Sequence, residues 1–445
     1  MIQQIQIIGY RRYFVNTEYF NSSKNDVAFL FIGGESEASV SWMTYGSWLD
    51  LAPRYGALLF QLEHRYYGES QPFSDLSIEN MRYLTSSQVL ADVAYFISSI
   101  NEEYSLSPDV KWIVFGGSYA GSLAAWARLK YPHLIHGAVS SSGPVNVTLN
   151  YFEYMQVVAD DLALSGQDCI ETLRTAIAQV EDLIQNPGDD NVTDIFNLCD
   201  NIEDDAENTL NLANFFGAIT DIFAAIAQYN KLFSELPTTD DICTILRNEE
   251  IGTEIYRLAE VNKLESVFGS DDSDCLDYKY ETRQWSYQVC TEFGTFQTTD
   301  QEDQIFGNRL TLDFYVQPCI DVYDEEFNET FISNRVLETN INYGALNINV
   351  SNVVYVYGSY DPWSKAGLTV TTNPDSPVIL INGTSHCANI DLSIEKMRYL
   401  TSAQALADMA YFISLMNEEY DLSPDVKWIV FGGSYAGTCQ SRGQD

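Results

Sequence analysis

The chain has 445 residues and carries 63 Asp and Glu against 23 Lys and Arg, which gives a formal net charge of −40. A charge of this size repels phosphate groups, so we exclude nucleic acid and anionic membranes as partners. The length allows one large domain with an insertion, or two domains, with enough residues to bury a substantial core.

The first third of the chain alternates apolar runs with helical patterns. Residues 27–34, VAFLFIGG, predict a buried parallel strand that ends in a glycine loop, and residues 56–68 repeat this pattern. From 86 to 104 apolar residues recur at three- and four-residue spacing, which is typical of an amphipathic helix. The strand WIVFGG, a helix over 122–130 and a strand over 135–141 follow. This order predicts an α/β domain with a mostly parallel sheet and helices on both faces.

The middle of the chain has a different character. Residues 150–347 contain helical stretches with little strand alternation and hold six of the eight cysteines. We therefore predict an inserted helical cap that disulfides hold together. Strand patterns return over 352–357 and 377–381. The predicted parts are 1–149 and 348–390 for the α/β domain, 150–347 for the cap, and 391–445 for a repeated segment with a short tail.

The last part repeats an earlier one. Residues 391–437 match residues 75–121 with seven substitutions over 47 positions. Solenoid repeats need several adjacent copies that stack on one another, and this is a single distant copy. The repeat therefore indicates duplication of one coding segment or an error in gene assembly, and we do not expect it to form a functional domain.

A serine follows the strand WIVFGG in the sequence GGSYAG. Ser118 has four apolar strand residues before it and a predicted helix after it, which is the context of a nucleophile elbow. Ala120 stands where the pattern G-x-S-x-G has its second glycine. The same ten residues surround Ser434, but no histidine follows that copy. Ser118 is therefore the predicted nucleophile.

The acid and the base of such an elbow come later in the chain, in the order serine, aspartate, histidine. His386 lies in a loop after the strand VILI, whereas His133 and His136 lie within twenty residues of Ser118. Asp361 follows the strand VVYVY and precedes His386 by 25 residues. We predict that His386 takes the serine proton and that Asp361 holds the imidazole in the required tautomer.

Acyl transfer also needs donors for the oxyanion. We expect the backbone N–H of Tyr119, at the start of the following helix, to supply one donor. The second is expected from the glycine loop after the first strand, near Gly33 and Gly34, with Gly34 as the candidate. With only four histidines and no CxxC pair, a zinc site is not predicted, and we expect no metal and no cofactor.

Five motifs carry a family resemblance: EHRYYGES at 63–70, FGGSYAGSLAAWARLKYPH at 115–133, RQWSYQVCTEFG at 283–294, YDPW at 360–363 and GTSHC at 383–387. In this order they resemble the serine peptidase family of lysosomal Pro-X carboxypeptidase, dipeptidyl peptidase II and thymus-specific serine protease. The serine motif is most similar to the thymus-specific branch. The resemblance spans Arg11 to Asn389.

The resemblance implies an α/β-hydrolase fold with a cap, peptide substrates, and Ser118, Asp361 and His386 as the triad. It also implies that Trp363 forms an aromatic wall of the pocket for proline, although a packed core tryptophan is the alternative. We therefore expect an exopeptidase that cleaves after proline. Carboxypeptidase and dipeptidyl peptidase activity both stay open, as do an esterase or lipase and an inactive secreted binding protein. A homodimer is compatible with all of these.

The cysteines and six N-x-[ST] sequons favour a secretory route, so we expect a secreted, lysosomal or endosomal glycoprotein. The first residues, MIQQIQIIGYRRYF, lack the apolar core of a signal peptide, and we expect that peptide to be missing from this sequence. The most apolar stretch, 211–229, is interrupted by Asp221, so we expect no membrane insertion. The sequons lie at Asn21, Asn146, Asn191, Asn328, Asn349 and Asn382.

Overall fold

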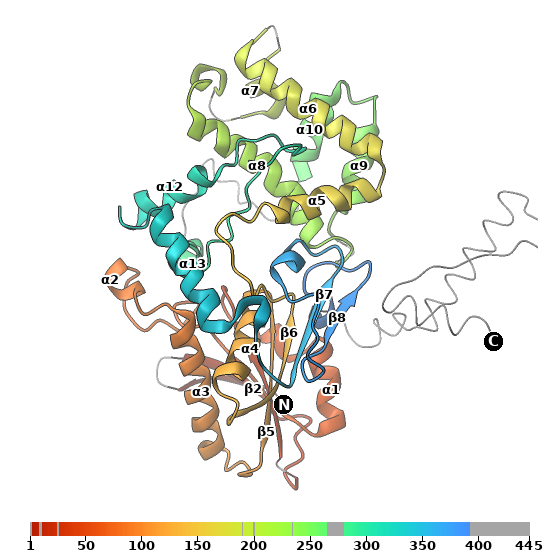
Figure 1. The fold of residues 1–445 in the computed structure, drawn as a ribbon. Coiled ribbons are helices and arrows are strands. Elements are labelled where there is room, and N and C mark those ends of the chain that lie inside the picture. Colours follow the sequence, from red (N-terminus) through yellow and green to blue (C-terminus); the bar gives the residue numbers. More distant parts are fainter. Residues whose placement is uncertain are drawn as a thin grey trace, which may run out of the picture. The chain divides into compact units, whose positions relative to one another are not determined.

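A computed structural model describes residues 2–8, 11–24, 26–188, 190–198, 201–233, 235–264 and 280–391. These residues are built around an eight-stranded sheet in the order β1-β2-β4-β3-β5-β6-β7-β8 (Figure 1). The predicted repeated segment lies outside the described residues except for Asp391.

Six strands form the parallel part of the sheet, and each matches a predicted strand. They are β3 Val27–Ile32, β4 Leu58–Leu62, β5 Lys111–Gly117, β6 Ile135–Ser141, β7 Val353–Gly358 and β8 Val378–Ile381. Two further strands, β1 Ile2–Ile8 and β2 Arg11–Asn16, form an antiparallel edge in which β2 pairs with β4. The sequence pattern of this N-terminal segment predicted neither strand.

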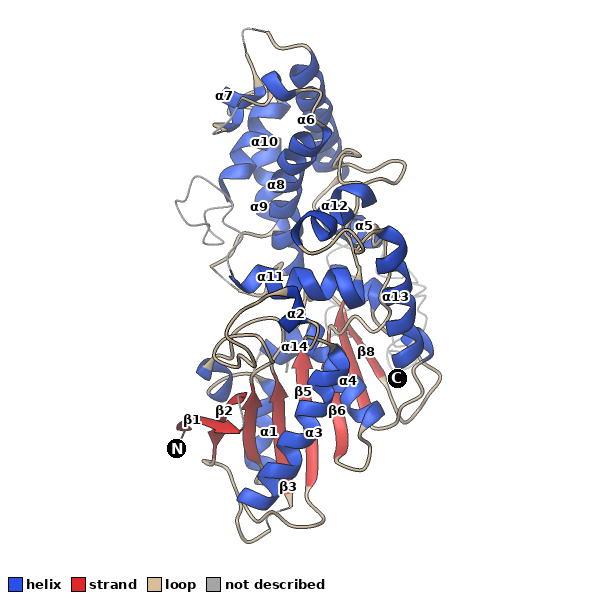
Figure 2. Ribbon diagram, turned by 90° about the vertical axis from the view of Figure 1, so that its left-hand side faces the viewer, coloured by secondary structure: helices blue, strands red, loops and turns tan. Residues whose placement is uncertain are grey.

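The alternation of side chains along β3 explains why both faces of the sheet are covered. Leu30 belongs to the larger core, with residues of α3 (Ser86–Glu103) and α4 (Tyr119–Lys130), while Phe31 packs with α1 (Ser47–Tyr55). Successive residues of a strand point to opposite faces, so a run that is apolar throughout needs helices on both sides. Figure 2 shows the sheet between these helices. The predicted α/β architecture is confirmed.

The chain between β6 and β7 is helical in all its longer described elements. These are α5 Glu153–Leu164, α6 Gln167–Gln185, α7 Val192–Phe196, α8 Thr209–Gln228, α9 Thr239–Arg247, α10 Glu254–Asn262, α11 Tyr280–Gln288, a π-helix over Val289–Phe293, α12 Leu312–Val322 and α13 Glu329–Tyr343. Buried residues of α6 recur at three- and four-residue spacing, as in Cys169, Leu173 and Ala176. This spacing gives the helix one apolar side to bury.

Helices of this insertion belong to two different cores. Residues of α5 to α10 form a core of their own, whereas residues of α11 to α13 such as Tyr287 and Val336 belong to the core of the sheet. Disulfides hold both groups, as predicted for the cap: Cys169 is bonded to Cys243, and Cys290 to Cys319. The boundaries at 150 and 347 stay a prediction.

Helix α8 has the length and mean hydropathy of a membrane-spanning segment, and among the described helices it alone passes that test. However, 61% of its most apolar window is buried inside the protein. Phe216 and Phe223 of this helix lie in the core of the insertion. The apolar composition of α8 is therefore that of a core helix.

Candidate active site

Ser118 occupies the sharp turn between β5 and α4. Its backbone has φ 57° and ψ −132°, a left-handed conformation that is strained for a residue with a side chain. A Cβ on Gly116 would lie 2.1 Å from the carbonyl oxygen of Ala120, and one on Gly121 would lie 2.7 Å from that of Ser141. The turn thus needs glycine two residues before and three residues after the serine.

His386 and Asp361 meet at the carboxyl end of the sheet. Asp361 follows β7 and His386 follows β8, and the imidazole Nδ1 lies 2.8 Å from Asp361 Oδ1. Both side chains are almost fully buried. A carboxylate only accepts hydrogen bonds, so Nδ1 carries the proton and Nε2 is left to accept another. The two predicted residues are brought together in the geometry that a general base requires.

Two contacts fix the loop that carries His386, and a third fixes the side chain of Asp361. The backbone N–H of His386 donates to the carbonyl oxygen of Gln228, the last residue of α8, at 3.0 Å. The N–H of Cys387 donates to Ser142 Oγ at 2.9 Å, beyond the end of β6. Asp361 Oδ1 also accepts from the backbone N–H of Trp363 at 2.9 Å. The insertion and the sheet therefore position the imidazole together.

Charge sets the protonation of this pair. Burial is the largest single effect and alone would lower the pKa of His386, but the interactions with Asp361 and, after it, Cys387 together raise that pKa well above its usual value. Asp361 therefore stabilises the imidazolium that forms when His386 accepts a proton. Cys387 is free, and burial raises the pKa of its thiol.

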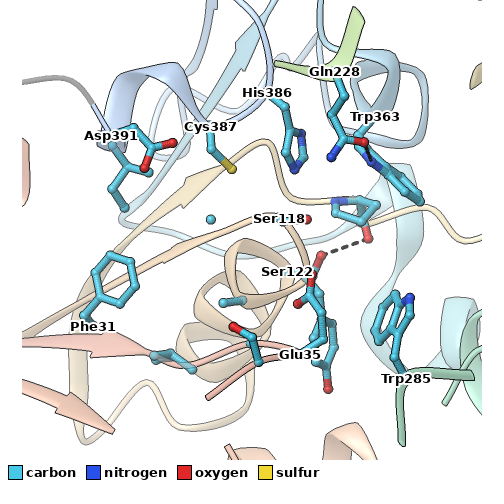
Figure 3. A pocket seen from close by; sticks show the side chains of 18 of the residues that line it. Phe31, Glu35, Ser118, Ser122, Gln228, Trp285, Trp363, His386, Cys387 and Asp391 are labelled. Carbon is cyan, nitrogen blue, oxygen red and sulfur yellow. Dashed lines mark hydrogen bonds between the residues drawn. The ribbon is translucent and has the colours of Figure 1, made fainter. Parts of the chain in front are cut away.

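Ser118 and His386 line one pocket of about 600 Å³, a volume in the range of small-ligand sites. Figure 3 shows the imidazole of His386 directed toward Ser118. Trp363, Trp285 and Gln228 form aromatic and amide parts of the wall. The pocket thus combines the predicted nucleophile, the predicted base and apolar surface.

The two predicted oxyanion residues also lie at this pocket. Gly34 lines it, and a Cβ on Gly34 would lie 3.5 Å from Ala120 Cβ, so the loop after β3 packs against the start of α4. Tyr119 is the first residue of α4, where backbone N–H groups lack helical partners. Neighbouring Gly33 donates its N–H to Leu62 at 2.8 Å. Because the N–H of Gly33 is already bonded, the N–H of Gly34 is the remaining candidate for the second oxyanion donor.

The Tyr119 side chain is held by a buried hydrogen-bond network. Gln288 Nε2 donates to the Tyr119 hydroxyl at 2.9 Å, and this hydroxyl lies 3.2 Å from His64 Nε2. His64 Nδ1 lies 2.7 Å from the carbonyl oxygen of Arg65, so Nδ1 is the protonated nitrogen and Nε2 accepts. Burial, aided by the charge of Arg11, lowers the pKa of His64 to about 3. His64 is thus a neutral structural residue.

Trp363 lines the pocket and is also packed against the insertion. Its ring stacks on Tyr151 at 5.5 Å between centroids and meets Tyr154 edge to face at 5.4 Å. Its Nε1 donates to Gln228 Oε1 at 2.9 Å, and the Tyr154 hydroxyl donates to the same oxygen at 2.7 Å. Sequence reasoning missed Gln228, because a glutamine at the end of an apolar helix gives no catalytic signal. No group of three potential metal ligands occurs among the described residues.

Parallel strands in this order, a serine on a strained turn after β5, and an aspartate and a histidine after β7 and β8 define an α/β-hydrolase fold with the layout of a serine hydrolase. The sequence matches the profile of the family described as serine carboxypeptidase S28 over residues 10–393, and again over 389–442. The chain belongs to this family of serine peptidases. The predicted family resemblance is confirmed.

Two relatives give the degree of similarity. The chain is 32% identical over 404 residues to the thymus-specific serine protease of Mus musculus, covering 85% of this chain and 78% of the relative. It is 30% identical over 385 residues to the lysosomal Pro-X carboxypeptidase of Mus musculus, covering 81% and 75%. Among solved structures, a proline iminopeptidase of Mycobacterium smegmatis aligns over 95% of this chain and 99% of its own, with 12% identity and a TM-score of 0.40.

Proposed function

We propose that the protein is a serine exopeptidase that cleaves peptides after proline, with Ser118 as nucleophile, His386 as base and Asp361 as its partner. The observation that carries the proposal is the 2.8 Å contact between His386 Nδ1 and Asp361 Oδ1 in the pocket that Ser118 lines. Membership of a serine peptidase family supports peptides as substrates. The same contact would serve an esterase, and membership of a peptidase family is what favours a peptidase over it.

The reaction proceeds through an acyl-enzyme. Ser118 Oγ attacks the scissile carbonyl carbon while its proton moves to His386 Nε2, and the oxyanion accepts hydrogen bonds from the N–H groups of Tyr119 and Gly34. The C–N bond breaks when His386 returns the proton to the leaving amine. Water then attacks the ester, His386 takes its proton, and Ser118 recovers a proton as the carboxylic acid leaves.

The preference for proline is assigned to Trp363. Its indole is held by Tyr151, Tyr154 and Gln228, so it presents a fixed aromatic face to the pocket. A rigid apolar ring loses little entropy on binding such a face, which favours proline over flexible residues. One relative is named a Pro-X carboxypeptidase, which supports this assignment.

A pair of matched tripeptides tests the function. We expect Ala-Pro-Phe to be cleaved at the Pro–Phe bond, and Ala-Ala-Phe to have a kcat/KM about 10-fold or more lower, because it lacks the proline ring. An enzyme that recognises the amino end of the peptide and one that recognises its carboxyl end can both cleave this bond. Trp363→Leu should lower the ratio of the two kcat/KM values toward one. Cleavage of neither tripeptide by folded protein would rule out the proposal, and equal cleavage would rule out the proline preference.

We further propose that the protein works in an acidic or secreted compartment. One relative is named lysosomal, and disulfides persist in oxidising compartments. Burial, followed by repulsion from Asp160, raises the pKa of Asp161 on α5 to about 8, against the opposing charge of Lys231. Burial likewise raises the pKa of Glu292 to about 7. These carboxyl groups are more easily kept neutral, and thus buried at lower cost, in acid.

The stability of the protein should therefore fall as the pH rises from 5 to 7.5. In this range Asp161 is ionised in the unfolded chain and protonated in the folded one, so folding binds a proton and weakens with rising pH. Over 2.5 pH units the Asp161 contribution is about 3 kcal/mol, and Asp161→Asn should remove it. Urea unfolding at several pH values measures this. Asp109→Asn, which removes a carboxylate from an exposed site that does not affect the pKa of Asp161, is the control. Equal pH slopes for wild type and Asp161→Asn would contradict the prediction.

A further inference from the structure

The charged groups on the pocket wall are acidic. Glu35 and Asp391 line the pocket together with His386, and no Lys or Arg occurs among the described residues that line it. A carboxypeptidase must bind the free α-carboxylate of its substrate, and arginine and lysine are the side chains that bind carboxylates strongly. The described wall therefore offers a substrate carboxylate no Lys or Arg, and its two carboxyl groups repel that carboxylate when they are ionised.

Glu35 has the better position of the two carboxylates. It directly follows Gly34, whose loop packs against the start of α4 beside Ser118. Figure 3 shows Glu35 on the far side of Ser118 from His386, and Asp391 beyond Cys387, on the side of His386 opposite to Trp363. A peptide with its proline on Trp363 and its carbonyl at Ser118 can thus present its amino end to the loop of Glu35.

Glu35 also lacks a cation of its own. Two residues further on, Glu37 pairs with Arg12 at 2.7 Å, but none of the ion pairs found in the described part of the chain includes Glu35. Burial raises the pKa of Glu35, against the opposing effects of a hydrogen bond from its own backbone N–H and, after it, of the charge of His386. A partly buried carboxylate without a cation gains most when a ligand brings one.

We propose that Glu35 binds the free α-ammonium group of the substrate, and that the protein is accordingly a dipeptidyl peptidase that releases Xaa-Pro from the amino end of peptides. This inference rests on the proposed function, since it specifies from which end of the substrate peptide the same triad releases residues. An α-ammonium group is charged below about pH 7.7 and forms charge-assisted hydrogen bonds with a carboxylate. Acetylation removes that charge and should block cleavage.

Forms of one tripeptide that are blocked at one end or the other test which free terminus the protein requires. Wild-type protein should cleave Ala-Pro-Phe and Ala-Pro-Phe-amide at similar rates, and acetyl-Ala-Pro-Phe at least 100-fold more slowly. Cleavage of the acetylated peptide but not the amide, or equal cleavage of both, would overturn the inference while leaving the proposed function intact. Failure to cleave unblocked Ala-Pro-Phe would instead contradict the proposed function.

A substitution then tests the residue. Glu35→Gln keeps the shape of the side chain and removes its charge, so kcat/KM for Ala-Pro-Phe-amide should fall about 10- to 100-fold, with little change for its acetylated form. The ratio between the two peptides is the decisive measurement. Glu102→Gln, which removes the same charge from an exposed site on α3, should leave the ratio unchanged.

Two results with these variants would overturn the assignment to Glu35. The first is an equal fall for free and acetylated peptides in Glu35→Gln, since this would mean that Glu35 acts on the charge of His386 and not on the substrate. The second is a ratio that collapses in Asp391→Asn but not in Glu35→Gln.

Discussion

Replacing Ser118 with alanine should lower kcat for Ala-Pro-Phe by about 10⁶-fold and abolish labelling by a fluorophosphonate probe. Ser118 is the proposed nucleophile, and loss of the nucleophile in a triad removes the whole covalent route at once. Because Ser118 already has φ 57°, alanine at this position adds no new backbone strain of its own. The variant should therefore stay folded, which circular dichroism and thermal unfolding would show.

Two other serines provide controls for this experiment. Ser122 lies one turn further along α4, lines the same pocket and donates to the carbonyl oxygen of Pro144 at 3.0 Å. Ser434 lies in the second copy of the same ten residues. Ser122→Ala and Ser434→Ala should both keep the labelling. Labelling that survives in Ser118→Ala, or that disappears in Ser434→Ala, would show that Ser118 is not the nucleophile.

The positions of the triad candidates could be predicted because each depends on a local pattern. Ser118, Asp361 and His386 all follow apolar strands, and parallel strands bring their carboxyl ends to one edge of the sheet. The chain order then selects among the few remaining residues. The structure places Ser118 and His386 at one pocket and Asp361 Oδ1 2.8 Å from His386 Nδ1, although their roles stay a proposal.

Other parts of the site could not be predicted because they depend on contacts between distant segments. Gln228 reaches Trp363 across 135 residues of chain, and nothing around it in sequence distinguishes it from a surface glutamine. The pairing of Cys169 with Cys243 is one of many pairings that six cysteines allow. Glu35 is one of 63 acidic residues, and only its place on the pocket wall distinguishes it.

The insertion was predicted as one cap, but its helices differ in what they bury. Gln288, on α11, donates a hydrogen bond to the Tyr119 hydroxyl, so part of the insertion helps to hold the turn that carries Ser118. Residues of α5 to α10 form a separate core, which meets the site through Trp363 and Gln228. Amphipathic periodicity shows that a helix has an apolar side, but not which core receives that side.

Replacing Asp361 should separate two contributions of the triad carboxylate. Asp361→Ala should lower kcat by about 10⁴-fold, because His386 Nδ1 and the Trp363 N–H both lose their acceptor. Asp361→Asn should cost less, about 10²- to 10³-fold. The Trp363 N–H is a fixed donor, so an asparagine side chain is held with its oxygen, and not its NH₂ group, toward His386. The tautomer then survives and only the charge is lost.

Loss of the Asp361 charge should shift the pH dependence of the reaction in a defined direction. The Asp361 carboxylate raises the pKa of His386, so Asp361→Asn should lower it, and the imidazole then stays unprotonated down to a lower pH. The acid limb of kcat/KM against pH should therefore move to lower pH in Asp361→Asn, while the maximum rate falls. A merely structural role for Asp361 would lower the rate and leave the limb in place. A limb that moves to higher pH would contradict the assignment of Asp361 as the partner of the base.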